Sequence, residues 1–136
     1  MGSTTAMSAR SLQYYVIANR WVAKLEFFDI ETPFLYYLMD EYFMRLCEPS
    51  CQKKFKQIIT DLSKLETDRK IIRPLLDRQL NEIILMSEDI VPENIDSLAE
   101  QQIKIEYLFN SLTTKYRAVK KDLFALTDSF RKSKSN

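Results

Sequence analysis

Histidine, the side chain that most often does acid–base or metal chemistry, is absent from this chain. Histidine is the commonest general acid or base, the commonest metal ligand and the side chain that titrates near neutral pH. Its absence excludes Ser-His-Asp and Cys-His catalysis. It also excludes the Glu-x-x-His motif that holds the metals of di-iron helical bundles.

The carboxylates and the single glycine do not supply an alternative chemistry. The adjacent acids Asp40-Glu41 and Glu88-Asp89 diverge on a helix, because side chains three or four residues apart are the ones that meet. Gly2 is the only glycine, which leaves no glycine-rich loop to hold a nucleotide phosphate. The sequence therefore predicts a protein that is not an enzyme and that has no cofactor and no metal site. Only residues that folding brings together would change this prediction.

The two cysteines, Cys47 and Cys51, are four residues apart, where one predicted helix ends and the next begins. Two thiols do not complete a zinc site. One hypothesis for the pair is a redox switch or a local disulfide, and the other is two reduced thiols packed near a helix turn. We favour reduced thiols, because small proteins stabilised by disulfides usually carry more cysteines.

Charge and hydropathy narrow the classes of partner. Twenty Lys+Arg and 19 Asp+Glu leave a net charge of +1, so no global field steers the chain toward nucleic acid. Lys53, Lys54 and Lys56 are expected at the same end of the bundle as the basic residues from Lys115 onward. Acidic residues are expected at that end too, so nucleic acid is not a predicted partner. No apolar run reaches the roughly 18 residues that a membrane span needs. We expect a cytoplasmic protein that makes no contact with membranes.

The elements that position these residues are indicated by three stretches in which apolar residues recur at alternating steps of four and three. This spacing is typical of a helix packed along one side at about 3.5 residues per turn. The first such seam is Trp21, Leu25, Phe28, Thr32, Leu35, Met39, Tyr42 and Leu46. The second is Phe55, Ile58, Leu62, Leu65, Arg69, Ile72, Leu76, Gln79, Ile83 and Met86. The third is Leu98, Gln102, Ile105, Phe109, Leu112, Tyr116, Val119, Leu123, Leu126 and Phe130.

The seams predict an all-α fold, an antiparallel up-down-up bundle of three long helices in a single domain over residues 1–136. Helices are expected over about 11–47, 51–88 and 97–131, with residues 1–10 and 132–136 fraying. Pro49 should end the first helix, Ser50 should cap the second, and Ser97-x-x-Glu100 is a capping box for the third. Pro33 and Pro74 should kink their helices. If Pro74 breaks the middle helix outright, the bundle has four helices.

The first helix carries a second run of apolar residues beside its seam, which we call the aromatic stripe. Its members are Phe27, Ile30, Phe34, Tyr37, Leu38 and Phe43. A helix that is apolar on most of its circumference is normally buried on most of it, and exposed aromatic patches usually mark interfaces. We therefore expect the protein to self-associate as a homo-oligomer, with Phe27, Phe34, Tyr37 and Leu38 as the interaction face. The predicted function is a structural or protein-interaction module.

Four seam positions are polar: Thr32, Arg69, Gln79 and Gln102. Counting back from the turns places Gln79 level with Gln102, and Arg69 level with Tyr116. Register control is one hypothesis for these polar layers, because slipped pairings would leave the polar groups without partners. Local winding near Pro74, which would let Arg69 and Gln79 reach solvent, is another. The third is a small polar pocket around Arg69, which would make the protein a ligand-binding or sensory bundle.

Two segments resemble a group of small bacterial helical-bundle proteins. They are Trp21-x-x-x-Leu25-x-Phe27-Phe28-x-x-Glu31-x-x-Phe34-Leu35 and Tyr116-Arg117-x-x-Lys120-Lys121-x-x-Phe124. The chain departs from the pattern by placing Pro33 inside the first segment. The resemblance implies a cytoplasmic bacterial bundle, and it brings no activity and no functional residues with it.

Overall fold

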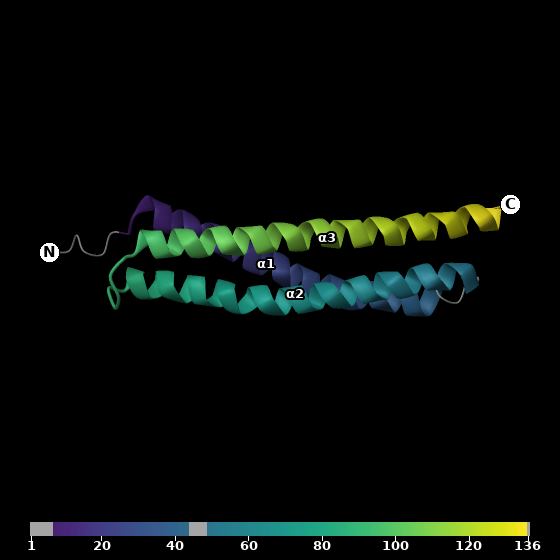
Figure 1. The fold of residues 1–136 in the computed structure, drawn as a ribbon, viewed down its shortest axis with the longest axis horizontal. Helices are drawn as coiled ribbons and strands as arrows, with labels where there is room; N and C mark the ends of the chain where they lie inside the picture. Colours follow the sequence, from purple (N-terminus) through teal and green to yellow (C-terminus); the bar gives the residue numbers. More distant parts are fainter. Residues whose placement is uncertain (1–6, 44–48, 136) are drawn as a thin grey trace. The chain divides into compact units, whose positions relative to one another are not determined.

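The computed structural model describes residues 7–43 and 49–135 and is helical through almost all of them. Figure 1 shows the element order, which is α1 (Ala9–Leu38), η2 (Met39–Phe43), α2 (Pro49–Ser87) and α3 (Ile95–Ser135). Within these described residues there is no β-strand. The predicted all-α class and the three long helices are confirmed.

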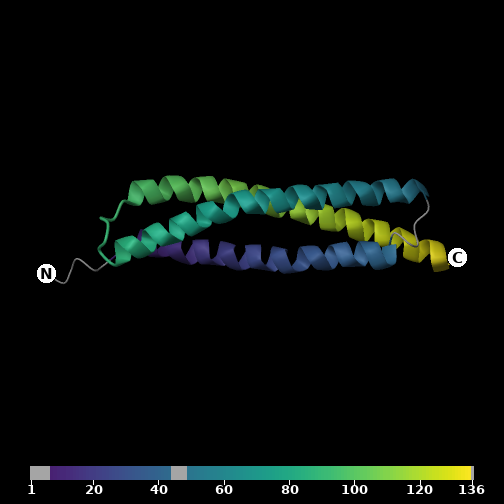
Figure 2. The same cartoon turned by 90° about the horizontal axis from the view of Figure 1, so that it is seen from below.

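The chain divides into two compact units, and each unit takes one segment from each long helix. The first unit is Met1–Glu26 with Arg69–Asn110, and the second is Phe27–Asp68 with Ser111–Asn136. In each unit the segment of α2 runs opposite to those of α1 and α3, which can be followed by colour in Figures 1 and 2. Each unit is therefore an up-down-up three-helix bundle.

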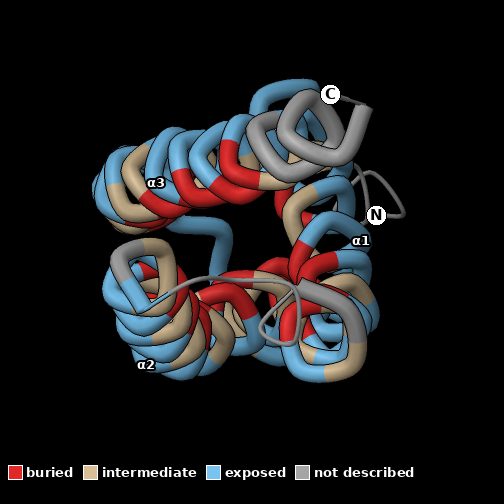
Figure 3. Tube along the Cα trace, turned by 90° about the vertical axis from the view of Figure 1, so that its right-hand side faces the viewer, coloured by how far each residue is buried: buried red, intermediate tan, exposed pale blue. Residues whose placement is uncertain are grey.

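The predicted seams form the cores of these units. All ten residues of the second seam are buried, and so are the nine residues of the third seam before Phe130. In α1 the buried residues of the seam are Leu25, Phe28, Thr32, Leu35 and Met39. Figure 3 shows these buried positions as a band along the inward side of each helix. The side chains of Tyr42, Leu46 and Phe130 lie outside the described residues.

The starts of α2 and α3 differ from the prediction. The predicted end of the first helix near Cys47 lies outside the described residues. Pro49 begins α2, because proline fits the first turn of a helix, where its missing N–H costs nothing. Ser50 therefore lies inside α2, and the prediction that it caps the helix is wrong. At α3 the cap is Asn94, whose Oδ1 accepts the amide of Ser97 at 3.1 Å. Asparagine caps a helix as well as serine does, so α3 begins before the predicted Ser97.

The two internal prolines do not end their helices. Pro33 lies inside α1 and Pro74 lies inside α2, which runs as one element from Pro49 to Ser87. The four-helix alternative is therefore wrong. An internal proline costs about 3 kcal/mol through its lost hydrogen bond and its steric clash. Ile72 and Leu76, on either side of Pro74, are both buried, and packing of this kind offsets that cost.

Cys51, in the first turn of α2, is disulfide-bonded. The preference for two reduced thiols is therefore wrong for this residue. The chain has one other cysteine, Cys47, which lies outside the described residues. Two cysteines four apart at a helix boundary can approach within the 4.4–6.8 Å between Cα atoms that a disulfide usually needs, so composition alone was a poor guide.

The end of α2 uses a left-handed residue that is not glycine. Asp89 has φ 58°, the amide of Asp89 donates to the carbonyl of Met86 at 3.2 Å, and that of Ile90 donates to the carbonyl of Leu85 at 2.9 Å. These two bonds are the Schellman pattern that closes a helix C-terminus. Aspartate enters this region more readily than most residues, which explains how a chain with no glycine here makes the turn.

Candidate functional site

The aromatic stripe lies mainly on the solvent side of α1 in the second unit. Phe27, Ile30, Phe34 and Tyr37 keep 52%, 74%, 56% and 53% of their surface exposed, and Leu38 is partly buried. Residues at steps of three, four and three lie on one side of a helix, so these side chains form a continuous apolar surface. The ring of Phe27 lies 6.3 Å from that of Phe28, centroid to centroid. The side chain of Phe43 lies outside the described residues.

The other side of the same α1 segment is held against α3 by Tyr116. The Tyr116 hydroxyl and the Thr32 hydroxyl share a buried hydrogen bond of 3.1 Å. The Tyr116 ring lies 4.3 Å from that of Phe28, centroid to centroid. Tyr116 is 1% exposed, so turning α1 about its axis would break a buried hydrogen bond and an aromatic contact together. These contacts fix which side of α1 faces solvent.

A partly buried ion pair supports the same orientation. Lys120 Nζ donates to Glu31 Oε1 at 3.1 Å and also lies 5.5 Å from the centroid of the Tyr116 ring. An ammonium group at that distance from an aromatic face is attracted by it. Glu31 and Lys120 thus connect α1 to α3 at the edge of the contact that Thr32 and Tyr116 make.

The predicted polar layer of Gln79 and Gln102 exists in the first unit. Gln79 Nε2 donates to Gln102 Oε1 at 3.1 Å and to the carbonyl of Leu98 at 2.9 Å. Gln79 is fully buried and Gln102 is 5% exposed, so the alternative in which Gln79 reaches solvent is wrong. Gln79 Oε1 and Gln102 Nε2 are buried without a hydrogen-bond partner. Because the two glutamines meet in only one register, the layer disfavours slipped packing.

Arg69 is buried, with 8% of its surface exposed, so this side chain does not reach out into solvent either. A cleft of about 560 Å³ lies between α2 and α3 of the second unit. Its lining is Asp61, Lys64, Leu65, Thr67, Asp68, Lys115, Ala118, Val119 and Asp122. This lining does not include Arg69, and it mixes both charges, with Lys115 Nζ 3.7 Å from Asp68 Oδ2.

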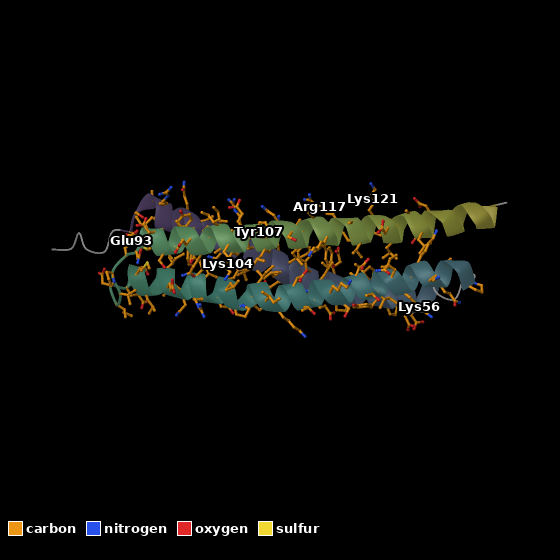
Figure 4. All side chains as sticks on the ribbon, viewed as in Figure 1. Lys56, Glu93, Lys104, Tyr107, Arg117 and Lys121 are labelled. Carbon is orange, nitrogen blue, oxygen red and sulfur yellow. The ribbon has the colours of Figure 1, made fainter. Side chains whose placement is uncertain are left out.

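A polar contact at the start of α1 was not predicted from the sequence. The Ser8 and Ser11 hydroxyls both donate to Glu93 Oε1, at 2.6 and 2.5 Å, and Ser8 Oγ accepts the amide of Ser11 at 3.2 Å. Ser8 is thus the cap of α1, which begins two residues before the predicted Ser11. Glu93 lies in the connection between α2 and α3 (Figure 4). Serine before a helix was the available signal, but nothing in the sequence linked it to Glu93.

The half-satisfied glutamine layer generates a stability prediction. Gln79→Leu alone should lower the free energy of unfolding by about 1–2 kcal/mol, because it leaves the buried amide of Gln102 without its partner. Adding Gln102→Leu should restore at least the wild-type value, since no buried amide then remains. Urea denaturation measures both, with the exposed Gln13→Leu as a control expected to change stability by less than about 0.5 kcal/mol. A double variant less stable than Gln79→Leu would show that the layer stabilises the fold.

The Glu93 contact predicts a pH dependence. Hydrogen bonds from Ser11 and then Ser8 hold the pKa of Glu93 below its ordinary value of 4.5. A carboxyl group with a lowered folded-state pKa contributes stability above its unfolded-state pKa and loses it as pH falls through the folded-state value. Below pH 4.5 the wild type should therefore lose stability more steeply than Glu93→Gln. Equal slopes in chemical denaturation would contradict this, and Glu88→Gln in the same connection is the control.

Neither the search for other kinds of site nor the comparison with known proteins indicates a function. Among the described residues, no cluster of Cys, Asp and Glu side chains could hold a metal ion, and no helix has the long apolar stretch that crossing a bilayer requires. Comparisons with protein-family models, with curated proteins and with solved structures each return no match for this chain. The resemblance to small bacterial helical-bundle proteins stays a prediction, and the function has to be inferred from the residues themselves.

Proposed function

We propose that this protein is a non-enzymatic interaction module that self-associates through the aromatic stripe of α1. The observation that carries this proposal is the exposure of Phe27, Ile30, Phe34 and Tyr37 side by side on one helix face. Isolated exposed apolar residues are normal, but contiguous patches mark interaction sites. Aromatic residues are enriched in the cores of such interfaces and contribute most of their binding energy.

The stripe has enough unburied apolar surface to support association. Full burial of a Phe-sized side chain is worth about 1.5–3 kcal/mol, and these side chains are about half exposed. Covering the remainder is worth about 1 kcal/mol for each side chain, on both copies of a symmetric dimer. For four side chains on each of two copies the total is about 8 kcal/mol, which exceeds the lower estimates of the cost of bringing two chains together, about 4–15 kcal/mol. The expected dimer is of moderate affinity.

The alternative, a small-ligand bundle with a polar pocket around Arg69, has no comparable support. The cleft in the second unit is lined by other residues, so the Arg69 pocket stays a prediction. A cytoplasmic location also stays a prediction. The disulfide of Cys51 argues against it, because structural disulfides are typical of oxidising compartments.

Sedimentation equilibrium tests the proposal with a variant and a matched control. Phe34→Glu with Tyr37→Glu places two carboxylates in the stripe and should weaken dimerisation at least about tenfold. Phe124→Glu is the control, because Phe124 on α3 of the same unit is 53% exposed and its helix neighbours Lys121 and Asp128 are polar. The control should dimerise as the wild type does.

Circular dichroism must show that both variants keep the helical content of the wild type. A wild type that stays monomeric at high micromolar concentration would refute the proposal. So would a folded Phe34→Glu, Tyr37→Glu variant that dimerises as tightly as the wild type.

A further inference from the structure

The middle of the aromatic stripe lies directly behind Thr32, the residue that holds α1 in the core of the second unit. Thr32 is fully buried and shares a hydrogen bond with Tyr116. Ile30 and Phe34 come two residues before and two residues after it. At about 100° of rotation per residue, both side chains point about 200° away from that of Thr32, to the opposite side of the helix. The stripe can therefore meet a partner without disturbing the core.

The spacing of the stripe is the same when it is read from either end. Its exposed members follow one another at steps of three, four and three, so Phe27 and Tyr37 are each five residues from Thr32. Two stripes that pair antiparallel at the level of Thr32 therefore place Phe27 of each copy opposite Tyr37 of the other, and Ile30 opposite Phe34. Ile30, the one aliphatic residue of the four, then meets an aromatic ring instead of a second Ile30.

The charges beside the stripe favour the antiparallel order over the parallel one. From Phe27 to Phe43 every charged residue is acidic. A parallel pair places each acidic residue level with its own copy at a helix separation of about 8–10 Å, where like charges repel. An antiparallel pair about Thr32 separates the two copies of Asp40 by about 24 Å along the helix axis. This exceeds the Debye length of about 10 Å at 0.1 M salt.

The acidic residue nearest to the middle of the stripe already has a basic partner. Glu31 lies next to Thr32 in sequence, so an antiparallel pair would bring its two copies close together. In each chain Lys120 Nζ lies 3.1 Å from Glu31 Oε1. The centre of the pair therefore contains two lysines for its two glutamates, and it is not a cluster of unpaired carboxylates.

We infer that two copies of this chain pair through α1 of their second units, antiparallel, about a two-fold axis that passes between Ile30 and Phe34 at the level of Thr32. This inference rests on the proposed self-association and specifies its geometry. A two-fold interface uses the same surface on both copies, and the equal steps of the stripe on either side of Thr32 satisfy that condition. Apolar burial supplies the affinity, and the acidic residues select the order of the helices.

Charge complementation between two variants tests which residues face each other. Phe27→Glu and Tyr37→Lys should each weaken self-association about tenfold or more, because each places a charge in an apolar contact. Mixed together, they should form a heterodimer at least about tenfold tighter than either homodimer. In that heterodimer the new carboxylate of one chain faces the new ammonium group of the other, and the second contact between Phe27 and Tyr37 is unchanged.

The matched control places both charges at the same position of the two chains. Phe27→Glu mixed with Phe27→Lys should not recover, because the antiparallel pair keeps these two positions about 15 Å apart along the helix axis. In a parallel pair they would be level, and this mixture would recover in place of the first. Sedimentation equilibrium measures each variant and each mixture, and circular dichroism must show that every variant keeps the helical content of the wild type.

Distances between spin labels give a second, independent measurement of the order. A nitroxide-bearing unnatural amino acid at position 40, where Asp40 is exposed, leaves the native cysteines untouched. The antiparallel pair places the two labels about 24 Å apart along the helix axis, whereas a parallel pair places them about one helix separation apart, about 8–10 Å. A distance below about 20 Å would overturn the antiparallel order.

The outcomes separate this inference from the proposed function. Loss of dimerisation in Phe34→Glu, Tyr37→Glu together with recovery only in the mixture of Phe27→Glu and Phe27→Lys would keep self-association through the stripe and reject the antiparallel order. Recovery in neither mixture would reject the pairing about Thr32. A dimer that tolerates Phe34→Glu, Tyr37→Glu would reject both the inference and the proposed function. Recovery only in the mixture of Phe27→Glu and Tyr37→Lys, with a long label distance, would support both.

Discussion

Helix α1 has two apolar sides, and the structure depends on which of them is buried in the core. In the second unit the core side is held by the buried hydrogen bond between Thr32 and Tyr116 and by the contact of the Tyr116 ring with the Phe28 ring. A buried hydroxyl that loses its partner costs about 1–3 kcal/mol, so α1 cannot turn to bury its other side without loss. The exposure of the aromatic stripe follows from this, since the side that carries Phe34 and Tyr37 has no place left in the unit. An exposed apolar surface on α1 is therefore a consequence of how the core is closed.

Hydrophobic burial is the main driving force in the proposed dimer. The aromatic stripe would supply most of the affinity, because burial of apolar area is the dominant favourable term in association. The buried glutamine layer of the first unit has a different role inside the fold, where a polar layer disfavours slipped packing.

Most of the fold could be predicted from apolar periodicity, because side chains at alternating steps of four and three share one helix face independently of the loop conformations. It predicted every buried position of the second seam, and short connections set the register well enough to place Gln79 opposite Gln102. Local chemistry was harder to predict. Pro49 and Asn94 suit either a loop or a helix start, and the neighbouring Ser50 and Ser97 were equally good caps. The contact of Ser8 with Glu93 joins residues 85 apart in sequence, which no local pattern reveals. The aromatic stripe was predicted, but its exposure follows from contacts that only the folded chain contains.

If the protein self-associates through the aromatic stripe, the stripe loses contact with water when two chains meet. Fluorine NMR measures this directly, with 4-fluorophenylalanine placed at Phe34 in one sample and at Phe124 in another. The shift of each resonance between H₂O and D₂O reports exposure of the ring, and it can be followed across a range of protein concentrations. If the stripe is buried in a dimer, the isotope shift at Phe34 should shrink as concentration rises while that at Phe124 stays constant. An isotope shift at Phe34 that stays as large as that at Phe124 at every concentration would contradict it.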